Sequence, residues 1–191
     1  QFLFAALQLP ILPTYNDFQY KFTYRPNQKN KISFIGLGAI DDFNLNAGVN
    51  DNVDDDDTRE FNNFILGNIP LQEQWNYTFG VNWLHYSENS YQNIVVSRNM
   101  LNNTSSRYKD LVETPENLLL DYSSFEAENK FRFEHTYNKN GWRINAGLGY
   151  EYARYYNSTY NNVTIQGQPV VIDYESNSYL SKFALFSQVS K

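Results

Sequence analysis

Aromatic and polar side chains alternate with a period of two in four segments of this chain, and no other feature constrains the fold as strongly. The mainly apolar sets are Phe18, Tyr20, Phe22 and Tyr24; Trp75, Tyr77, Phe79, Val81 and Trp83; Phe125, Ala127, Asn129, Phe131 and Phe133; and Trp142, Ile144, Ala146, Leu148, Tyr150 and Tyr152. Successive side chains of a strand point to opposite faces, so each segment predicts a strand with one apolar and one polar face. Two environments fit this pattern: a wall between lipid and a wet lumen, or a water-soluble sandwich whose core holds the aromatic rings.

The connections between these segments favour the first environment. Short polar turns are expected at 26–30, 87–90 and 138–141, where Asn, Ser, Pro and Gly gather. Long polar stretches at 41–74, 100–121 and 157–173 are expected to be loops. Short turns on one rim and long loops on the other are typical of outer-membrane β-barrels.

Composition is consistent with an acidic, tyrosine-rich β protein. The 191 residues carry a net charge of −6, include 16 tyrosines and contain no cysteine. A mean hydropathy of −0.61 suits a barrel wall, in which only every second residue is apolar. The sequence shows no basic stripe that could neutralise phosphates, which argues against nucleic acid as a partner.

We expect about eight strands, near 1–8, 16–26, 30–41, 75–87, 91–100, 121–137, 142–156 and 175–191. Both ends of the chain read as strands. The predicted fold class is therefore all-β, an antiparallel transmembrane β-barrel, and the chain is expected to be one arc of a larger barrel.

Four stretches then suggest a family: 12–21 with 36–43, 77–81 leading to His85 and Tyr86, and 96–101. They resemble barrel strands of TonB-dependent outer-membrane receptors of Bacteroidetes type, and the resemblance runs over most of the chain. It implies a barrel of about 22 strands around an N-terminal plug, importing a scarce nutrient with energy relayed by TonB. Neither the plug nor a TonB-contacting segment is recognised in this sequence, so residues 1–191 are expected to be a partial barrel domain.

The resemblance also implies a location and partners. The chain is expected in the bacterial outer membrane, in contact with lipid, with its own plug domain and the remaining strands, with TonB through the N-terminal part, and with an unidentified nutrient. A surface lipoprotein is one further type of partner to consider. Residues expected to face the lumen or plug are Lys21, Arg25, Asn82, Arg132 and Glu151, and those expected in external loops are Asp54, Asp55, Asp56, Asp57 and Tyr108.

No residue pattern predicts catalysis, a cofactor or a metal centre. His85 and His135 lie far apart in sequence, near predicted hairpin ends. Glu126 and Glu128 share a predicted strand face with Lys130 and Arg132, which indicates mixed-sign pairing rather than a carboxylate pair for glycoside chemistry. We therefore do not expect an enzyme.

The four consecutive aspartates at 54–57 form the strongest local charge feature. Glu60 follows them, but neither the spacing nor a turn glycine matches an EF-hand loop. We expect a solvated external loop here.

Two smaller features have structural explanations. The pairs Gly36/Gly38 and Gly147/Gly149 are expected to permit curvature or the close approach of another backbone, such as a plug. Aromatic residues at strand ends are expected to form interfacial girdles; these are Trp75, Trp83, Tyr86, Tyr91, Trp142, Tyr155 and Tyr156. Tyr108 and Tyr160 are expected in loops, where they could instead stack on a ligand.

Three hypotheses of function remain open at this point. The first is a piece of a TonB-dependent nutrient importer, and the second is a complete small outer-membrane barrel acting as an adhesin or structural protein. The third is a soluble carbohydrate-binding β-sandwich. Burial separates the third from the others, because Phe22, Tyr77, Phe131 and Leu148 would be core residues only in a sandwich.

Overall fold

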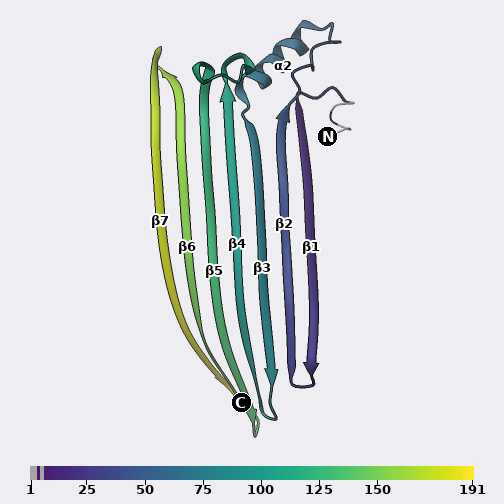
Figure 1. Cartoon of the computed structure of the whole chain (residues 1–191), viewed down its shortest axis with the longest axis vertical. Helices are drawn as coiled ribbons and strands as arrows, with labels where there is room; N and C mark the ends of the chain where they lie inside the picture. The colour runs from purple at the N-terminus through teal and green to yellow at the C-terminus, as the bar shows by residue number, and fades with distance from the viewer. Residues whose placement is uncertain (1–3, 5–6) are drawn as a thin grey trace.

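The computed structural model describes residue 4 and residues 7–191 of the chain, and its strands form one antiparallel sheet (Figure 1). Seven strands follow one another in chain order, each hydrogen-bonded to the next. They are β1 (Ile11–Asn27), β2 (Asn30–Leu45), β3 (Leu71–Tyr86), β4 (Ser90–Tyr108), β5 (Leu118–Lys139), β6 (Trp142–Ile165) and β7 (Gln168–Ser190). The antiparallel all-β architecture confirms the predicted fold class, and the open sheet is consistent with an arc.

The register places all four alternating sets on the same side of the sheet. Phe22 pairs with Phe34, which pairs with Val81. Val81 pairs with Val96, and the row continues through Phe131 and Tyr150 to Phe183. We call this side the apolar face and the other the polar face. The apolar belt denotes the apolar-face residues within 18–24, 32–40, 75–83, 94–100, 125–133, 144–152 and 183–189.

The apolar belt is not covered by any other part of the chain that the structure describes. Among the described residues, the buried apolar side chains are Val49, Leu66 and Ala127. Phe22 is 66% exposed, and Phe131 and Leu148 are each 38% exposed. Soluble proteins rarely expose apolar patches of this extent. The sheet is thus a single layer without the core that a sandwich requires.

The polar face is the concave one. The buried polar side chains on the strands are small groups of this face, namely Ser33, Ser124, Thr136 and Asn157. A hollow near the C-terminal end is lined by Arg143, Asn145, Gln188 and Ser190, which also belong to the polar face. Side chains converge on the inside of a curved sheet, so shielded small residues and hollows indicate the concave side.

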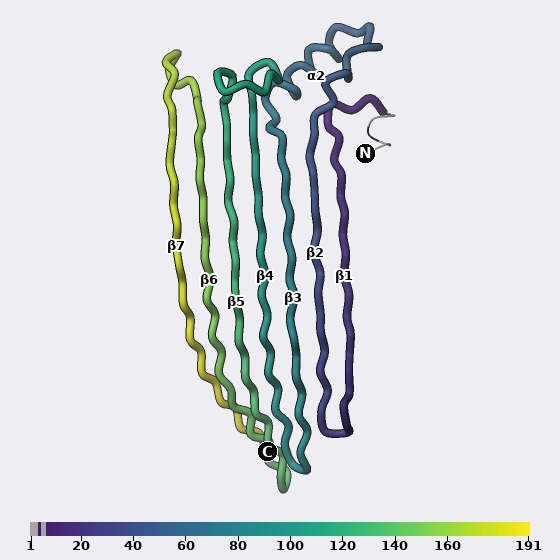
Figure 2. Tube along the Cα trace, in the orientation of Figure 1, coloured from purple at the N-terminus to yellow at the C-terminus, as the bar shows by residue number. Residues whose placement is uncertain are grey.

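The hairpin turns at one end of the sheet are short, as predicted. Chain reversals join β1 to β2, β3 to β4 and β5 to β6 at this end (Figure 2). The turn after β5 places Asn140 at φ 54° and Gly141 at φ 78°. Both angles are in the left-handed region that Asn and Gly adopt most readily, so the Asn-Gly pair fits this two-residue reversal.

At the opposite end, the predicted long loops were largely wrong. The stretch 157–173 continues β6 to Ile165, turns at Gln166 and Gly167, and enters β7. The stretch 100–121 continues β4 to Tyr108 and begins β5 at Leu118, with the 3-10 turns η1 (Lys109–Leu111) and η2 (Pro115–Asn117) between them. Tyr108 and Tyr160 are consequently strand residues.

The stretch 41–74 keeps its long connection but contains the helix α2 (Asp56–Asn68). Asp55 is its N-cap, because its Oδ2 accepts a hydrogen bond of 2.8 Å from the Thr58 backbone N–H. Asp56 and Asp57 lie in the first turn, where carboxylates interact favourably with the helix dipole. Asp54 and Asp55 precede the helix, as the prediction of loop residues requires, whereas that prediction was wrong for Asp56 and Asp57. No helix among the described residues is both long and apolar enough to cross a membrane.

Eight strands were expected and the described residues contain seven. Residues 1–3 and 5–6 of the expected strand at 1–8 lie outside the described residues, and Leu7 and Gln8 form a turn. The first and last strands, β1 and β7, are the two edges of the sheet and are not paired with each other. The structure is therefore not the closed small barrel of the second hypothesis.

Three of the four paired glycines make room for aromatic rings of the neighbouring strand. A Cβ on Gly36 would lie 2.3 Å from the Tyr20 ring, and one on Gly38 would lie 2.5 Å from the Phe18 ring. On the polar face, a Cβ on Gly147 would lie 2.5 Å from the Phe186 ring. Each ring lies over the glycine of the neighbouring strand, an arrangement that covers exposed backbone in sheets.

Candidate functional site

The five residues expected to face a lumen lie on strands whose polar side chains share the concave face. Lys21 pairs with Ile35 on β2, Asn82 pairs with Val95 on β4, and Arg132 pairs with Gly149 on β6. Arg25 alternates with Tyr24 beside a register shift at the end of β1. They form no single cluster, because Lys21 on β1 and Arg132 on β5 are four strand spacings of about 4.8 Å apart.

The charged residues of β5, β6 and β7 do come together. Lys130 Nζ lies 2.7 Å from Glu128 Oε2, and Lys182 Nζ lies 3.4 Å from Glu151 Oε2. Lys130 and Glu151 are register partners, so the charges form a continuous ladder of alternating sign. Arg132 pairs with Glu134 at the end of the ladder. This confirms mixed-sign pairing at Lys130 and Arg132 rather than a pair of isolated carboxylates.

Beside this charge ladder is a hollow of about 550 Å³. Most of its lining belongs to the polar face, including Lys130, Arg132, Lys182 and Phe186. The Arg132 guanidinium carbon lies 5.8 Å from the centroid of the Phe186 ring. Exposed ion pairs of this kind contribute at most about 1 kcal/mol each to stability, so their charges remain available to a solute or to another protein segment.

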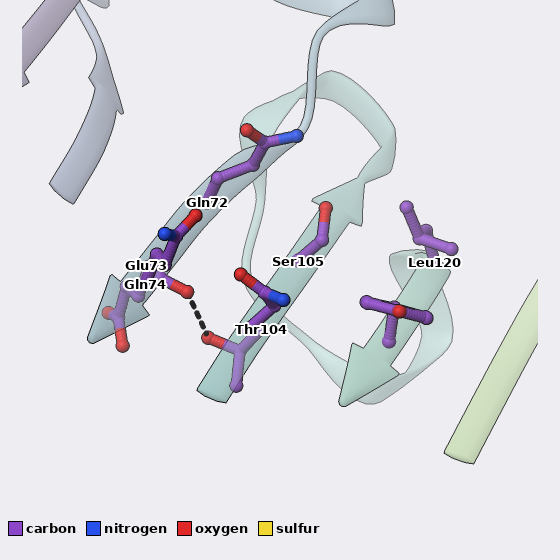
Figure 3. Close-up of a pocket in the computed structure, with 8 residues that line it drawn as sticks. Gln72, Glu73, Gln74, Thr104, Ser105 and Leu120 are labelled. Carbon is purple, nitrogen blue, oxygen red and sulfur yellow. Dashed lines mark hydrogen bonds between the residues drawn. The ribbon is translucent and has the colours of Figure 1, made fainter. Parts of the chain in front are cut away.

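The polar face nearer to α2 carries neutral hydrogen-bonding groups as well as charged ones such as Asp41 and Glu126. A hollow of about 390 Å³ there is lined by Gln72, Glu73, Gln74, Asn103, Thr104, Ser105, Leu120 and Tyr122. Figure 3 shows these side chains on three neighbouring strands, with the Thr104 hydroxyl near the backbone carbonyl of Glu73. Amide and hydroxyl groups of this sort can both donate and accept hydrogen bonds.

The rim near α2 contains Tyr108 and the acidic run. Tyr108 lines a hollow with Ile69, Leu71 and Leu111. Arg107 connects this rim to the helix, because its Nη1 donates a 3.4 Å hydrogen bond to the carbonyl of Asn68. Hydrogen bonds from the Thr58 hydroxyl and backbone lower the pKa of Asp55, and those from its own backbone N–H and from Thr114 lower the pKa of Glu116.

The aspartates do not form a metal centre. Within the part of the chain that the structure describes, no three His, Cys, Asp or Glu side chains gather closely enough to hold a metal ion. His85 lies at the hairpin end as expected, where its Nδ1 is 2.9 Å from Asn30 Oδ1. The Trp83 indole N–H donates to the same oxygen at 3.0 Å.

The residues expected in interfacial girdles are divided between the two faces of the sheet. Trp75 and Trp83 lie on the apolar face at the two ends of the β3 belt segment. The eight steps between them span about 27 Å along the strand, or about 20 Å in height at a tilt of about 40°. Tyr86 and Tyr91 are register partners on the polar face, so their assignment to a lipid-facing girdle was wrong.

Sequence analysis did not select Lys182, Asn93 or Phe186, although each contacts a selected residue. Asn82 Nδ2 donates a 2.8 Å hydrogen bond to Asn93 Oδ1, while Lys182 and Phe186 contact Glu151 and Arg132. The signal for Lys182 and Phe186 was present, because Leu180, Lys182, Ala184 and Phe186 alternate with the apolar residues of β7.

Comparison with known proteins identifies this fold. No protein-family model matches the chain, and no curated protein matches it. Solved structures do match. The ferric yersiniabactin uptake receptor FyuA from Yersinia pestis aligns with 93% of this chain at 7% identity and a TM-score of 0.50. The copper transporter OprC aligns with 94% at 8% identity and a TM-score of 0.56. The ferric-catecholate import receptor Fiu from E. coli K12 aligns with 93% at 10% identity and a TM-score of 0.54.

The sheet is thus similar to barrel walls of TonB-dependent outer-membrane receptors. At these identities the similarity concerns the fold. The chain spans 26%, 26% and 33% of the three matched proteins, respectively. Each of these matched proteins is a receptor or transporter by name.

Proposed function

We propose that this chain is a wall segment of a TonB-dependent outer-membrane receptor that imports a scarce nutrient. The observation that carries the proposal is the pairing of an uncovered apolar belt on the convex face with hydrogen-bonding and charged groups on the concave face. Water cannot stabilise such a belt, whereas the hydrocarbon of a bilayer can. The fold similarity to receptor barrels supports the same assignment.

In this proposal the barrel is completed by strands outside this chain. Edge strands β1 and β7 would each leave a row of unpaired N–H and C=O groups in hydrocarbon, at a cost of several kcal/mol per group. About seven strands would be roughly a third of a 22-stranded wall. The segments that resemble receptors of Bacteroidetes type support that subgroup, and the resemblance adds a plug, TonB and a surface lipoprotein as partners.

The concave face then lines the solute path or contacts the plug. Lys21, Arg25, Asn82, Arg132 and Glu151 take this role, and α2 with Asp54, Asp55, Asp56, Asp57 and Tyr108 lies at the external mouth. The orientation follows from connection length, because short turns of outer-membrane barrels face the periplasm and longer connections face outward.

Spin labels at two adjacent positions test which face meets lipid. Phe79 lies in the apolar belt and Thr78 lies beside it on the polar face. In the intact protein reconstituted in phosphatidylcholine vesicles, a nitroxide at Phe79→Cys should collide more with oxygen, which partitions into lipid. A nitroxide at Thr78→Cys should collide more with a water-soluble nickel chelate. A soluble sandwich would shield the Phe79 label from both reagents, and that result would refute the proposal.

Two further measurements address the whole protein. Intact mass and terminal sequence of the protein extracted from membranes should show a mass several times 22.4 kDa with plug sequence upstream. Cells lacking the protein, and cells lacking TonB, should share a growth defect on the same limiting nutrient. A protein near 22.4 kDa would refute the fragment interpretation.

A further inference from the structure

Two arginines lie on the face where positive charge is least expected. Arg98 pairs with Phe79 on β3 and with Asn129 on β5, in a row of the apolar face. Arg154 pairs with Ala127 on β5 and with Tyr179 on β7, one row nearer to α2. An arginine exposed to lipid costs about 2–4 kcal/mol at the bilayer midplane and about 0–1 kcal/mol near the interface. Two of them on one patch therefore require an explanation.

The Arg98 guanidinium is held by neutral groups. Its Nε donates a 2.9 Å hydrogen bond to the Tyr77 hydroxyl, and its Nη1 donates one of 2.9 Å to Asn129 Oδ1. These bonds use two of the five N–H donors of a guanidinium and fix its plane. Three donors remain for a ligand that approaches from outside the sheet.

Arg154 has a similar environment. Its Nε donates a 3.2 Å hydrogen bond to Asn177 Oδ1. Its guanidinium carbon lies 4.9 Å from the centroid of the Phe125 ring and 5.5 Å from that of Tyr179. Arginine stacked on rings is oriented as well as partly desolvated, which prepares it to bind an anion.

The chain does not neutralise these two charges. Among the described residues, neither Arg98 nor Arg154 has a carboxylate oxygen within 4.0 Å, whereas Lys130, Arg132 and Lys182 on the polar face all do. The charge ladder of the polar face is thus neutralised within the protein, whereas these two arginines of the apolar face are not. An external anion is the missing partner.

The position of Arg98 and Arg154 along their strands, close to the α2 end of the apolar belt, points to a lipid headgroup as the source of the anion. Met100 is the last belt residue of β4 on the α2 side, and Arg98 lies two residues before it on the same face. The hydrogen bond to the Tyr77 hydroxyl directs the Arg98 side chain toward α2. A step of this kind is about 7 Å, which a long arginine side chain spans when it snorkels to the interface. Arg154 is about two strand spacings away, or about 10 Å. Both reach the level where headgroups meet acyl chains.

We propose that Arg98 and Arg154 bind phosphate groups of an anionic lipid in the leaflet on the α2 side. Arginine forks match phosphate oxygens and form two parallel charge-assisted hydrogen bonds. The flanking belt residues Val96, Met100 and Phe125 contact the acyl chains, which a soluble anion lacks. This inference rests on the proposed function, because it needs the apolar face to meet lipid.

Native mass spectrometry of the intact, detergent-extracted protein tests the proposal. The probes are dioleoyl phosphatidic acid, dioleoyl phosphatidylcholine and inorganic phosphate. Wild-type protein should bind phosphatidic acid about tenfold more tightly than phosphatidylcholine, and Arg98→Gln with Arg154→Gln should remove that preference. Arg98→Lys should retain part of it, because the charge remains and the fork is lost. Arg143→Gln removes one positive charge from the polar face and is the matched control for each of the single variants Arg98→Gln and Arg154→Gln.

Several results would overturn the inference. Equal binding of both lipids by wild-type protein would do so, and so would an equal loss in Arg143→Gln. Inorganic phosphate bound as tightly as phosphatidic acid would assign the arginines to a soluble anion instead. The spin-label experiment separates the two proposals, since a lipid-exposed label at Phe79 without lipid preference refutes this inference alone. Comparing the lipids on wild-type protein does not depend on the folding of any variant.

Discussion

An arginine introduced on the apolar face of β4 should destabilise the folded protein much more than an arginine introduced at the next residue, on the polar face. Val96 lies in the apolar belt between Val81 and Phe131, near the middle of the β4 belt segment from Ile94 to Met100, and is 52% exposed. Ser97 follows it on the polar face and pairs with Gly80 and Lys130. The comparison is between Val96→Arg and Ser97→Arg in the intact protein.

The size of the effect follows from depth and from the space available. Near mid-bilayer, an arginine on the lipid face destabilises a barrel by about 2–4 kcal/mol, equivalent to about 30-fold to 900-fold in the folding equilibrium. The register partner of Ser97 on β3 is Gly80, and a Cβ on Gly80 would lie 3.2 Å from Ser97 Cβ. Because Gly80 has no side chain, the space beside Ser97 is open to a longer one. We expect less than about 1 kcal/mol there, because the charge stays in water near Lys130.

Urea unfolding in phosphatidylcholine vesicles, followed by tryptophan fluorescence, measures the difference. Resistance of the folded band to SDS without heating gives an independent check of barrel assembly. The reasoning fails if the two variants lose equal stability or if Ser97→Arg is the worse of the two. Either result would mean that the apolar belt does not face hydrocarbon.

Three other changes have expected outcomes. Phe131→Arg should impair membrane assembly by a few kcal/mol for the same reason as Val96→Arg, and an unchanged heat-modifiable band would contradict its place in the belt. Gly147→Val should weaken assembly, because the new Cβ would lie 2.4 Å from the Phe133 carbonyl oxygen. Gly67→Ala in α2 should be neutral or stabilising by up to about 1 kcal/mol, because nothing lies within 4 Å of the new Cβ. The urea midpoints of the two variants provide the comparison. Because the pKa of Asp55 is lowered from 3.8 in the folded protein, its capping contribution is present above that value and is lost as the pH falls through the lowered pKa. Amide hydrogen exchange of α2 should therefore accelerate in acid, and Asp55→Ala should exchange fast at neutral pH with little further change.

The strands that cross the proposed bilayer were predictable from the sequence. Lipid on one side and water on the other force a strict alternation, and Trp75 to Trp83 displays it without interruption. The register then follows, because a slip of one residue would transfer every ring to the wet face. The same logic placed the five residues proposed to face a lumen on one side of the sheet, although the pattern could not show that Lys21 is remote from Arg132.

The distal halves of the strands could not be predicted in the same way. Segment 102–106 reads Asn-Asn-Thr-Ser-Ser, which is typical of a loop, yet it is paired with both β3 and β5. Beyond the bilayer both faces of the sheet meet water, so alternation is no longer required while the backbone hydrogen bonds continue. The 24 residues of β6 extend about 80 Å, far more than the 9–11 residues that crossing requires.

Helix α2 was missed for a related reason. Its aspartates were interpreted by charge alone, although Asp55 followed by Thr58 is an N-cap arrangement and the carboxylates of the first turn favour a helix start. The helix buries only Asn62 and Leu66, so its apolar pattern is weak and local capping carries the signal.

Charge placement connects the two proposals about this wall. On the polar face, cations and carboxylates alternate across β5, β6 and β7, which keeps that surface hydrated without a strong net field. On the apolar face, the contacts of Arg98 and Arg154 among the described residues are with hydroxyl, amide and aromatic groups. Near the interface each such charge costs about 0–1 kcal/mol, and a bound anion offsets that cost. The same two arginines that would weaken the sheet in a neutral membrane therefore predict that it is stabilised by acidic lipid.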